Sequence, residues 1–163
     1  MPVSWVQSIN PIFIIVFSSA FAAIWTKLGR RQPSTVVKWM LGFAAVGIAY
    51  LLFLPFIGTG AHGTPLLAVA GIILVWTIGE LLFSPTGLAL TTKLSPRAFT
   101  SQMFALYFLS LAVGGAVSGT LAQLYDEQNE GPYFLALGIG TLVLAAVTLA
   151  ISPCVLRLMR GVR

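Results

Sequence analysis

Charged side chains are scarce in this chain, since only 8% of its 163 residues are Asp, Glu, Lys or Arg. It has four acidic residues, one His and one Cys, and a single Cys excludes an internal disulfide. No paired carboxylates, Cys/His cluster, nucleophile with a base at usable spacing or glycine-rich loop before a Lys occurs. These absences predict that the protein is not an enzyme and uses no metal or other cofactor.

Hydrophobic residues make up 58% of the sequence, and the mean hydropathy is +0.96, which indicates an integral membrane protein. Five apolar runs are long enough to cross a bilayer as helices, which takes about 20 residues. No low-complexity linker divides them, so the predicted fold is one all-α bundle over residues 1–163. The predicted spans are Trp5–Trp25, Trp39–Ile57, Leu66–Leu90, Phe99–Leu124 and Tyr133–Leu156.

The nine basic residues all fall in segments on one side of these five spans: Lys27, Arg30, Arg31, Lys38, Lys93, Arg97, Arg157, Arg160 and Arg163. They form no continuous patch for a nucleic acid, so no such partner is expected. The positive-inside rule assigns them to the cytoplasm, which places the C-terminus inside and the N-terminus outside. An outside start indicates that an earlier helix precedes the chain, and the five helices are expected to be the remainder of a longer protein.

The segment Ala20-Phe21-Ala22 has the small-x-small pattern of a signal-peptide cleavage site. Its basic residues follow the apolar stretch instead of preceding it, so a signal peptide is not expected. Trp and Tyr residues lie near the ends of the runs, where they are expected to anchor the helices at the membrane interface.

Glu80 is the one acidic residue outside a short loop that contains Asp126, Glu127 and Glu130. A carboxylate at the bilayer centre costs about 2.5–3.5 kcal/mol, so it marks a candidate ligand or proton site. The nearest base on the same run, Lys93, is about 20 Å away along the helix axis. Glu80 is therefore either protonated or paired with a cation from outside the chain. The structural alternative is a neutral Glu that is hydrogen-bonded between helices.

Two prolines lie next to the candidate polar residues of the first and third runs. Pro85 cannot donate to the carbonyl of Leu81, and Pro11 follows Asn10, so both are predicted to kink their helices. Asn10 shares a helix face with Gln7, where it makes either an interhelical hydrogen bond or a ligand contact. Other polar and small residues continue the Glu80 face at helical spacing: Trp76, Thr77, Ser84, Gly87 and Thr91.

Small residues in the other runs predict close helix packing. The second run has Gly42, Gly47 and Ala49, which assign it a scaffold role. The fourth run presents Tyr107, Ser110, Gly114 and Ser118 on one face, with a Gly115-x-x-x-Gly119 motif alongside. The fifth carries a seam of small residues at Gly138, Thr141, Ala145, Thr148 and Ser152. Tyr107 and Ser110 could also face a cavity. His62 lies in a loop with no second metal ligand nearby, and no role is expected for it.

Several ordered motifs resemble the C-terminal half of proton-dependent oligopeptide transporters, which are members of the major facilitator superfamily. The similarity covers nearly the whole chain. The motifs are Trp5-Val6-Gln7-Ser8-Ile9-Asn10-Pro11, Trp25-Thr26-Lys27-Leu28-Gly29-Arg30-Arg31-Gln32-Pro33-Ser34, Gly79-Glu80-Leu81-Leu82-Phe83-Ser84-Pro85, Thr92-Lys93-Leu94-Ser95-Pro96 and Ser101-Gln102-Met103 with Phe108-Leu109-Ser110.

The resemblance implies that the five runs correspond to helices eight to twelve of a carrier with both ends in the cytoplasm. In that family, residues matching Asn10 and Glu80 hold the amino end of a di- or tripeptide, and the Glu is poised against a Lys from the N-terminal half. The cavity aromatic that is commonly Trp in bacterial relatives is Tyr107 here. Ser84, Tyr107 and Ser110 are further candidate contacts.

The resemblance thus implies the C-terminal fragment of a proton-coupled peptide symporter, in the inner membrane of a bacterium. Its partners would be peptides, protons, the bilayer and an N-terminal helical half. Two alternatives stay open: a stand-alone five-helix scaffold or assembly protein, and a fragment of a carrier for another substrate such as nitrate or a drug. The positive group that Glu80 favours argues for peptides.

Overall fold

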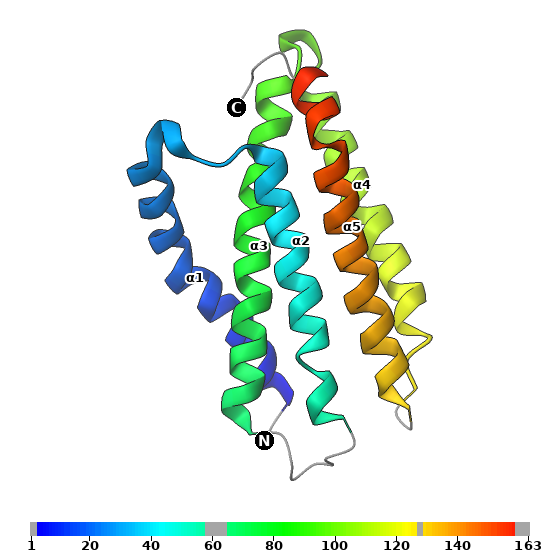
Figure 1. The fold of residues 1–163 in the computed structure, drawn as a ribbon. Helices are drawn as coiled ribbons and strands as arrows, with labels where there is room; N and C mark the ends of the chain where they lie inside the picture. Colours follow the sequence, from blue (N-terminus) through cyan, green and yellow to red (C-terminus); the bar gives the residue numbers. More distant parts are fainter. Residues whose placement is uncertain (1–2, 58–64, 127–128, 159–163) are drawn as a thin grey trace.

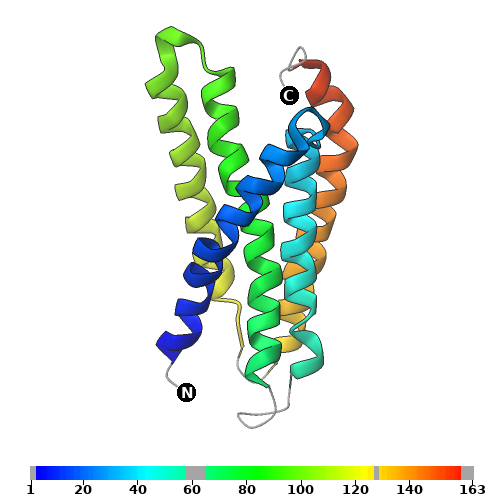
Figure 2. The same cartoon turned by 90° about the vertical axis from the view of Figure 1, so that its left-hand side faces the viewer.

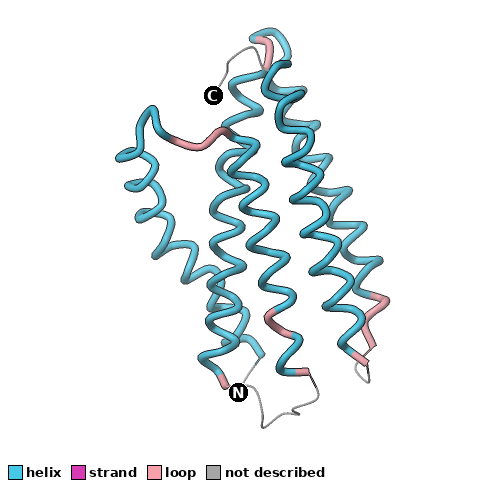
Figure 3. The backbone as a smooth tube through the Cα atoms, viewed as in Figure 1, coloured by secondary structure: helices cyan, strands magenta, loops and turns pink. Residues whose placement is uncertain are grey.

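The computed structural model describes residues 3–57, 65–126 and 129–158 of the chain. Within them the chain is helical almost throughout (Figure 3). The five long helices are α1 (Val3–Leu28), α2 (Thr35–Leu51), α3 (Leu66–Leu94), α4 (Thr100–Ala122) and α5 (Glu130–Leu158). Short 3-10 helices lie at Gly29–Arg31, Leu54–Phe56 and Arg97–Phe99. All five long helices are long and apolar enough to cross a membrane, so the predicted fold class is confirmed.

The helices run up and down, and α2 lies between α3 and α5, while α1 crosses α3 obliquely (Figure 1). From the side, α3 and α4 diverge from α2 and α5 toward the end where the C-terminus lies (Figure 2). That end also holds the end of α1, the start of α2 and the end of α3. The described basic residues therefore gather at one end of the bundle, as the alternating topology predicts.

Glycines lie at two close helix contacts, between α2 and α3 and between α2 and α5. A Cβ on Gly79 of α3 would lie 2.9 Å from the carbonyl oxygen of Gly42 on α2, and a Cβ on Gly42 would lie 3.0 Å from that of Gly79. On the other side of α2, a Cβ on Gly47 would lie 3.1 Å from the carbonyl oxygen of Gly138 on α5. Gly138, Ala145 and Ser152 of the α5 seam are buried, which confirms the packing roles predicted for α2 and α5.

The face of α4 that carries small residues differs, because Ser110, Gly114 and Ser118 are exposed. Nothing among the described residues would come within 4 Å of a Cβ at Gly114, Gly115 or Gly119. The helix contacts α3 through Tyr107, whose hydroxyl would lie 3.1 Å from a Cβ at Gly87. The predicted packing of these small residues is therefore not made within the described part of the chain.

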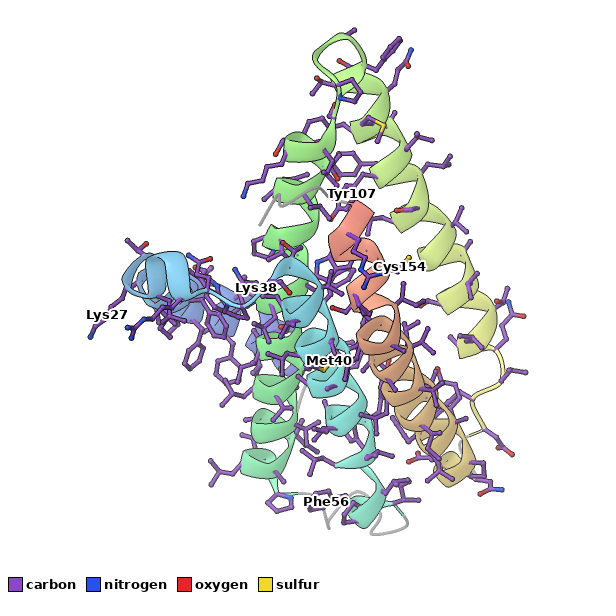
Figure 4. All side chains as sticks on the ribbon, turned by 45° about the horizontal axis from the view of Figure 1, so that its top comes forward. Lys27, Lys38, Met40, Phe56, Tyr107 and Cys154 are labelled. Carbon is purple, nitrogen blue, oxygen red and sulfur yellow. The ribbon has the colours of Figure 1, made fainter. Side chains whose placement is uncertain are left out.

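Helix boundaries differ from the predicted ones where a charged residue enters a helix. Lys38 was expected in a loop but lies in the first turn of α2, 8% exposed. Its Nζ donates to Gln32 Oε1 at 2.9 Å and lies 4.1 Å from the centroid of the Trp25 ring, while Gln32 Nε2 donates to the Trp25 carbonyl. These contacts satisfy the ammonium inside the turn. Lys38 lies close against the bundle, whereas Lys27 points away from it (Figure 4).

Other boundaries also differ from the predicted ones. The second predicted span ends early, because α2 stops at Leu51 and a 3-10 turn follows at Leu54–Phe56, where Pro55 cannot continue an α-helix. Helix α3 runs on to Leu94. Glu130 begins α5 instead of ending the loop, which puts an acid at the positive end of the helix dipole.

Trp39 of α2 contacts α3 next to Pro85, at Phe83 and Thr86. Its Nε1 donates to Thr86 Oγ1 at 2.8 Å, and its ring packs on that of Phe83 with 5.3 Å between centroids. Thr86 Oγ1 also lies 2.8 Å from the carbonyls of Leu82 and Phe83. The tryptophan therefore fixes the position of the helix turn that contains the proline.

Trp39→Phe should keep the ring contact and lose the hydrogen bond to Thr86. Interhelical hydrogen bonds in membranes contribute about 0.6 kcal/mol on average, so the expected loss of stability is of that size. SDS titration of the purified protein, followed by circular dichroism, measures it. Trp25→Phe, which keeps an aromatic ring beside Lys38 and removes an indole N–H with no described hydrogen bond, is the comparison variant. Equal losses in the two variants would contradict the assigned role of the hydrogen bond.

Candidate functional site

Glu80 is the central residue of the 29-residue helix α3, so the carboxyl lies midway along an apolar span. It is partly buried, and both of its described hydrogen-bond partners are neutral. Asn10 Nδ2 of α1 donates to Glu80 Oε2 at 3.1 Å. Trp76 Nε1, one turn earlier on α3, donates to Glu80 Oε1 at 3.0 Å. Each carboxyl oxygen therefore accepts one N–H.

The crossing of α1 over α3 creates this site, because it joins residues 70 positions apart in the sequence. Thr77 completes it: the residue is fully buried, and its Oγ1 lies 2.7 Å from Asn10 Oδ1 and 2.8 Å from the carbonyl oxygen of Ile73. The Tyr50 ring of α2 packs edge-on against Trp76 with 4.8 Å between centroids. Three helices thus hold one carboxyl, one amide, one hydroxyl and one indole together.

Close packing of Gly79 against α2 holds the backbone of α3 next to Glu80. Gly79 is buried against Gly42, so α2 and α3 are in close backbone contact one residue before the carboxyl. A larger residue at position 79 would move the backbone that carries Glu80. The sequence Gly79-Glu80 therefore combines a helix contact with a polar group.

Two of the five predicted substrate-binding residues, Asn10 and Glu80, contact each other directly in the structure. Ser84 lies one turn beyond Glu80 and is exposed. Tyr107 lies between α3 and α4 against Gly87 (Figure 4). Ser110 is exposed and donates to the carbonyl of Tyr107 at 2.7 Å. Ser84, Tyr107 and Ser110 make no direct hydrogen bond to Glu80, and their contact with a ligand stays a prediction.

Both prolines lie inside continuous helices, Pro11 in α1 and Pro85 in α3. Figure 2 shows α3 changing direction along its length. A kink at each proline stays a prediction. The side chain of Gln7 and all of His62 lie outside the described part of the structure.

The places of Thr77 and Trp76 in the Glu80 site were predicted from the sequence, but the contact between Thr77 and Asn10 was not. Their spacing of three and four residues from Glu80 places them on its helix face. The sequence offers no sign that Thr77 contacts Asn10, because that contact depends on how α1 crosses α3.

The model of the POT family (PTR2) matches residues 1–137 of the chain. The chain is 41% identical to the uncharacterized transporter YclF of Bacillus subtilis, over 98% of this chain and 32% of that protein. It is 40% identical to the di-/tripeptide transporter of Lactococcus lactis subsp. cremoris, over 98% of this chain and 33% of the relative.

A crystal structure of peptide transporter POT in complex with sulfate superposes with a TM-score of 0.85 at 38% identity. It covers 99% of this chain and 33% of the solved one. The chain spans about a third of the length of the curated relatives that it matches.

Proposed function

The chain belongs to the POT family, and from this membership we propose that it forms the C-terminal helical bundle of a proton-coupled di-/tripeptide symporter. Residues 1–163 would supply helices eight to twelve of a major facilitator carrier, and the preceding helices of the complete carrier would supply the other wall of the cavity. The bacterial inner membrane is the proposed location, with the basic end of the bundle in the cytoplasm. The di-/tripeptide transporter among the relatives supports the choice of substrate.

The observation that carries this proposal is a carboxyl held by neutral donors at the middle of an apolar bundle. Its described partners, Asn10 and Trp76, balance no charge. An ionised carboxylate at that depth is stabilised by a cation, and the α-ammonium of a peptide has the matching charge and three donors. Glu80 is therefore the proposed site for the amino end of the substrate.

The remaining predicted contacts are proposed to line the same cavity. Tyr107 would offer a stacking surface to a peptide side chain, and Ser84 and Ser110 would offer hydroxyl groups. Pro11 and Pro85 would give α1 and α3 the bends that open their backbones beside Asn10 and Glu80. No metal or other cofactor takes part in this scheme.

Transport would follow from the two halves rocking about the midplane site. With no substrate bound, a Lys from the N-terminal half would neutralise Glu80, and the arriving ammonium would displace it. Because the two cations compete for one carboxylate, substrate binding would change the contact between the two halves. Protons would enter through groups in both halves, and their gradient would drive uptake.

The test is uptake of a labelled dipeptide by the complete carrier in liposomes, with the outside more acidic than the inside. We expect uptake that needs the proton gradient and is inhibited by unlabelled di- and tripeptides, but not by nitrate. Uptake of another solute that peptides do not inhibit would overturn the proposed substrate. Dipeptide uptake that is unchanged when the gradient is removed would overturn the proton coupling.

A further inference from the structure

The hydroxyl of Thr77 has two acceptors within reach and one hydrogen. Its Oγ1 lies 2.7 Å from Asn10 Oδ1 and 2.8 Å from the carbonyl oxygen of Ile73, so it donates to only one of them at a time. Thr77 is also completely buried, and water cannot replace either partner. The orientation of the Asn10 amide therefore depends on which of the two acceptors the hydroxyl donates to.

In the arrangement observed, Thr77 donates to Asn10 Oδ1, and Asn10 Nδ2 donates to Glu80 Oε2. The amide thus directs its NH2 group at the carboxyl, while its oxygen is used by Thr77. Trp76 supplies the donor to the other carboxyl oxygen. The site is satisfied without a ligand, but it directs only donors at the position that a substrate ammonium would take.

A half-turn of the amide exchanges Oδ1 and Nδ2. Asn10 Nδ2 would then donate to the lone pair of Thr77 Oγ1, and the Thr77 hydrogen would turn to the Ile73 carbonyl, which is already at 2.8 Å. Asn10 Oδ1 would face Glu80, beside an ammonium bound there. Every buried polar group keeps a partner in this second arrangement, so the exchange avoids the penalty of an unsatisfied buried group.

We propose that Thr77 is a positioning residue that lets Asn10 act as a donor to Glu80 in the empty site and as an acceptor for the ammonium in the loaded site. This inference rests on the proposed function, since the ligand is a peptide with a free α-amino group. The aliphatic neighbours of Thr77 cannot do this, because they neither donate nor accept, whereas a hydroxyl does both through one oxygen atom. Thr77 thereby contributes to selectivity for the amino terminus without touching the peptide.

Thr77→Val and Thr77→Ser are the matched variants, because valine keeps the shape without the hydroxyl and serine keeps the hydroxyl without the methyl group. The experiment uses the complete carrier in liposomes and measures the KM of a labelled dipeptide. It also measures inhibition by the unlabelled dipeptide and by its N-acetylated form. Thr77→Val should raise the KM about 10-fold, because the empty arrangement loses one hydrogen bond of the hydroxyl, to Asn10 Oδ1, whereas the loaded arrangement loses two, from Asn10 Nδ2 and to the Ile73 carbonyl.

Inhibition by the N-acetylated dipeptide, which carries no ammonium, should change little in Thr77→Val. The selectivity for the free amino group should therefore shrink, and Thr77→Ser should restore both quantities to within about 2-fold of wild type. Thr77→Ala also removes the hydroxyl, so the same changes in KM and selectivity are expected of it as of Thr77→Val. It is used instead if Thr77→Val does not reach the membrane.

The possible failures separate the two proposals. A wild-type carrier that takes up no dipeptide overturns the proposed function, and this inference falls with it. A wild-type carrier that transports, with unchanged KM and selectivity in Thr77→Val, overturns the role of Thr77 alone. Equal weakening for both peptides, or a defect that serine does not restore, also overturns that role, since a merely structural threonine would behave in this way.

Discussion

Glu80→Gln should reduce dipeptide uptake by the complete carrier about 100-fold. The substitution keeps the shape of the side chain and an acceptor oxygen for Asn10, but it removes the charge that holds a substrate ammonium. Hydrogen bonds to charged groups contribute about 1.5–3 kcal/mol, and the upper part of that range corresponds to a factor of this size. Initial rates of uptake in liposomes, corrected for the amount of carrier inserted, measure the effect.

Glu130→Gln is the matched control for Glu80→Gln. Glu130 begins α5, a helix that supplies none of the described hydrogen-bond partners of Glu80, and its Oε1 accepts from the Tyr125 hydroxyl at 2.6 Å. The glutamine oxygen can keep that contact. Uptake by this variant should stay within about 2-fold of wild type, because an exposed pair contributes little. Wild-type uptake in Glu80→Gln, or equal losses in both variants, would refute the assigned role of Glu80.

The fold was predictable because length and hydropathy determine which segments can cross a bilayer. All five predicted spans exist as helices, and their alternation places the described bases at one end. The boundary error at Lys38 has a physical cause. A lysine normally marks the end of an apolar span, but here the Trp25 ring and the Gln32 oxygen satisfy its ammonium within the first turn of α2.

The site was predictable only in part. The rarity of acidic residues was enough to identify Glu80, and helical spacing placed Trp76 and Thr77 on its face. The pairing of Asn10 with Glu80 could not come from periodicity, because it depends on the angle at which α1 crosses α3. The family resemblance supplied that pairing instead. Ser84 shares the Glu80 stripe but is exposed, which helical spacing alone does not distinguish from burial.

Gly79→Ala is expected to have the largest effect on stability. The added Cβ would lie 2.9 Å from the carbonyl oxygen of Gly42 and 2.8 Å from Val46 Cγ2. The valine methyl can rotate away, but the carbonyl belongs to the backbone of α2, so the two helices must move apart. Overpacking of this kind costs typically about 1–3 kcal/mol. It would also displace Glu80 from Asn10, and dipeptide uptake should fall together with stability.

Gly71→Ala tests whether this loss comes from the helix contact or from the change of residue type. Gly71 is exposed on the same helix, and nothing described lies within 4 Å of its Cβ position. Alanine is the better helix former by about 0.8–1.0 kcal/mol, so this variant should be as stable as wild type or more so. SDS titration of the purified variants gives both values. Equal stability of Gly79→Ala and Gly71→Ala would show that α2 and α3 do not meet at Gly42 and Gly79, and the placement of Glu80 beside that contact would be wrong.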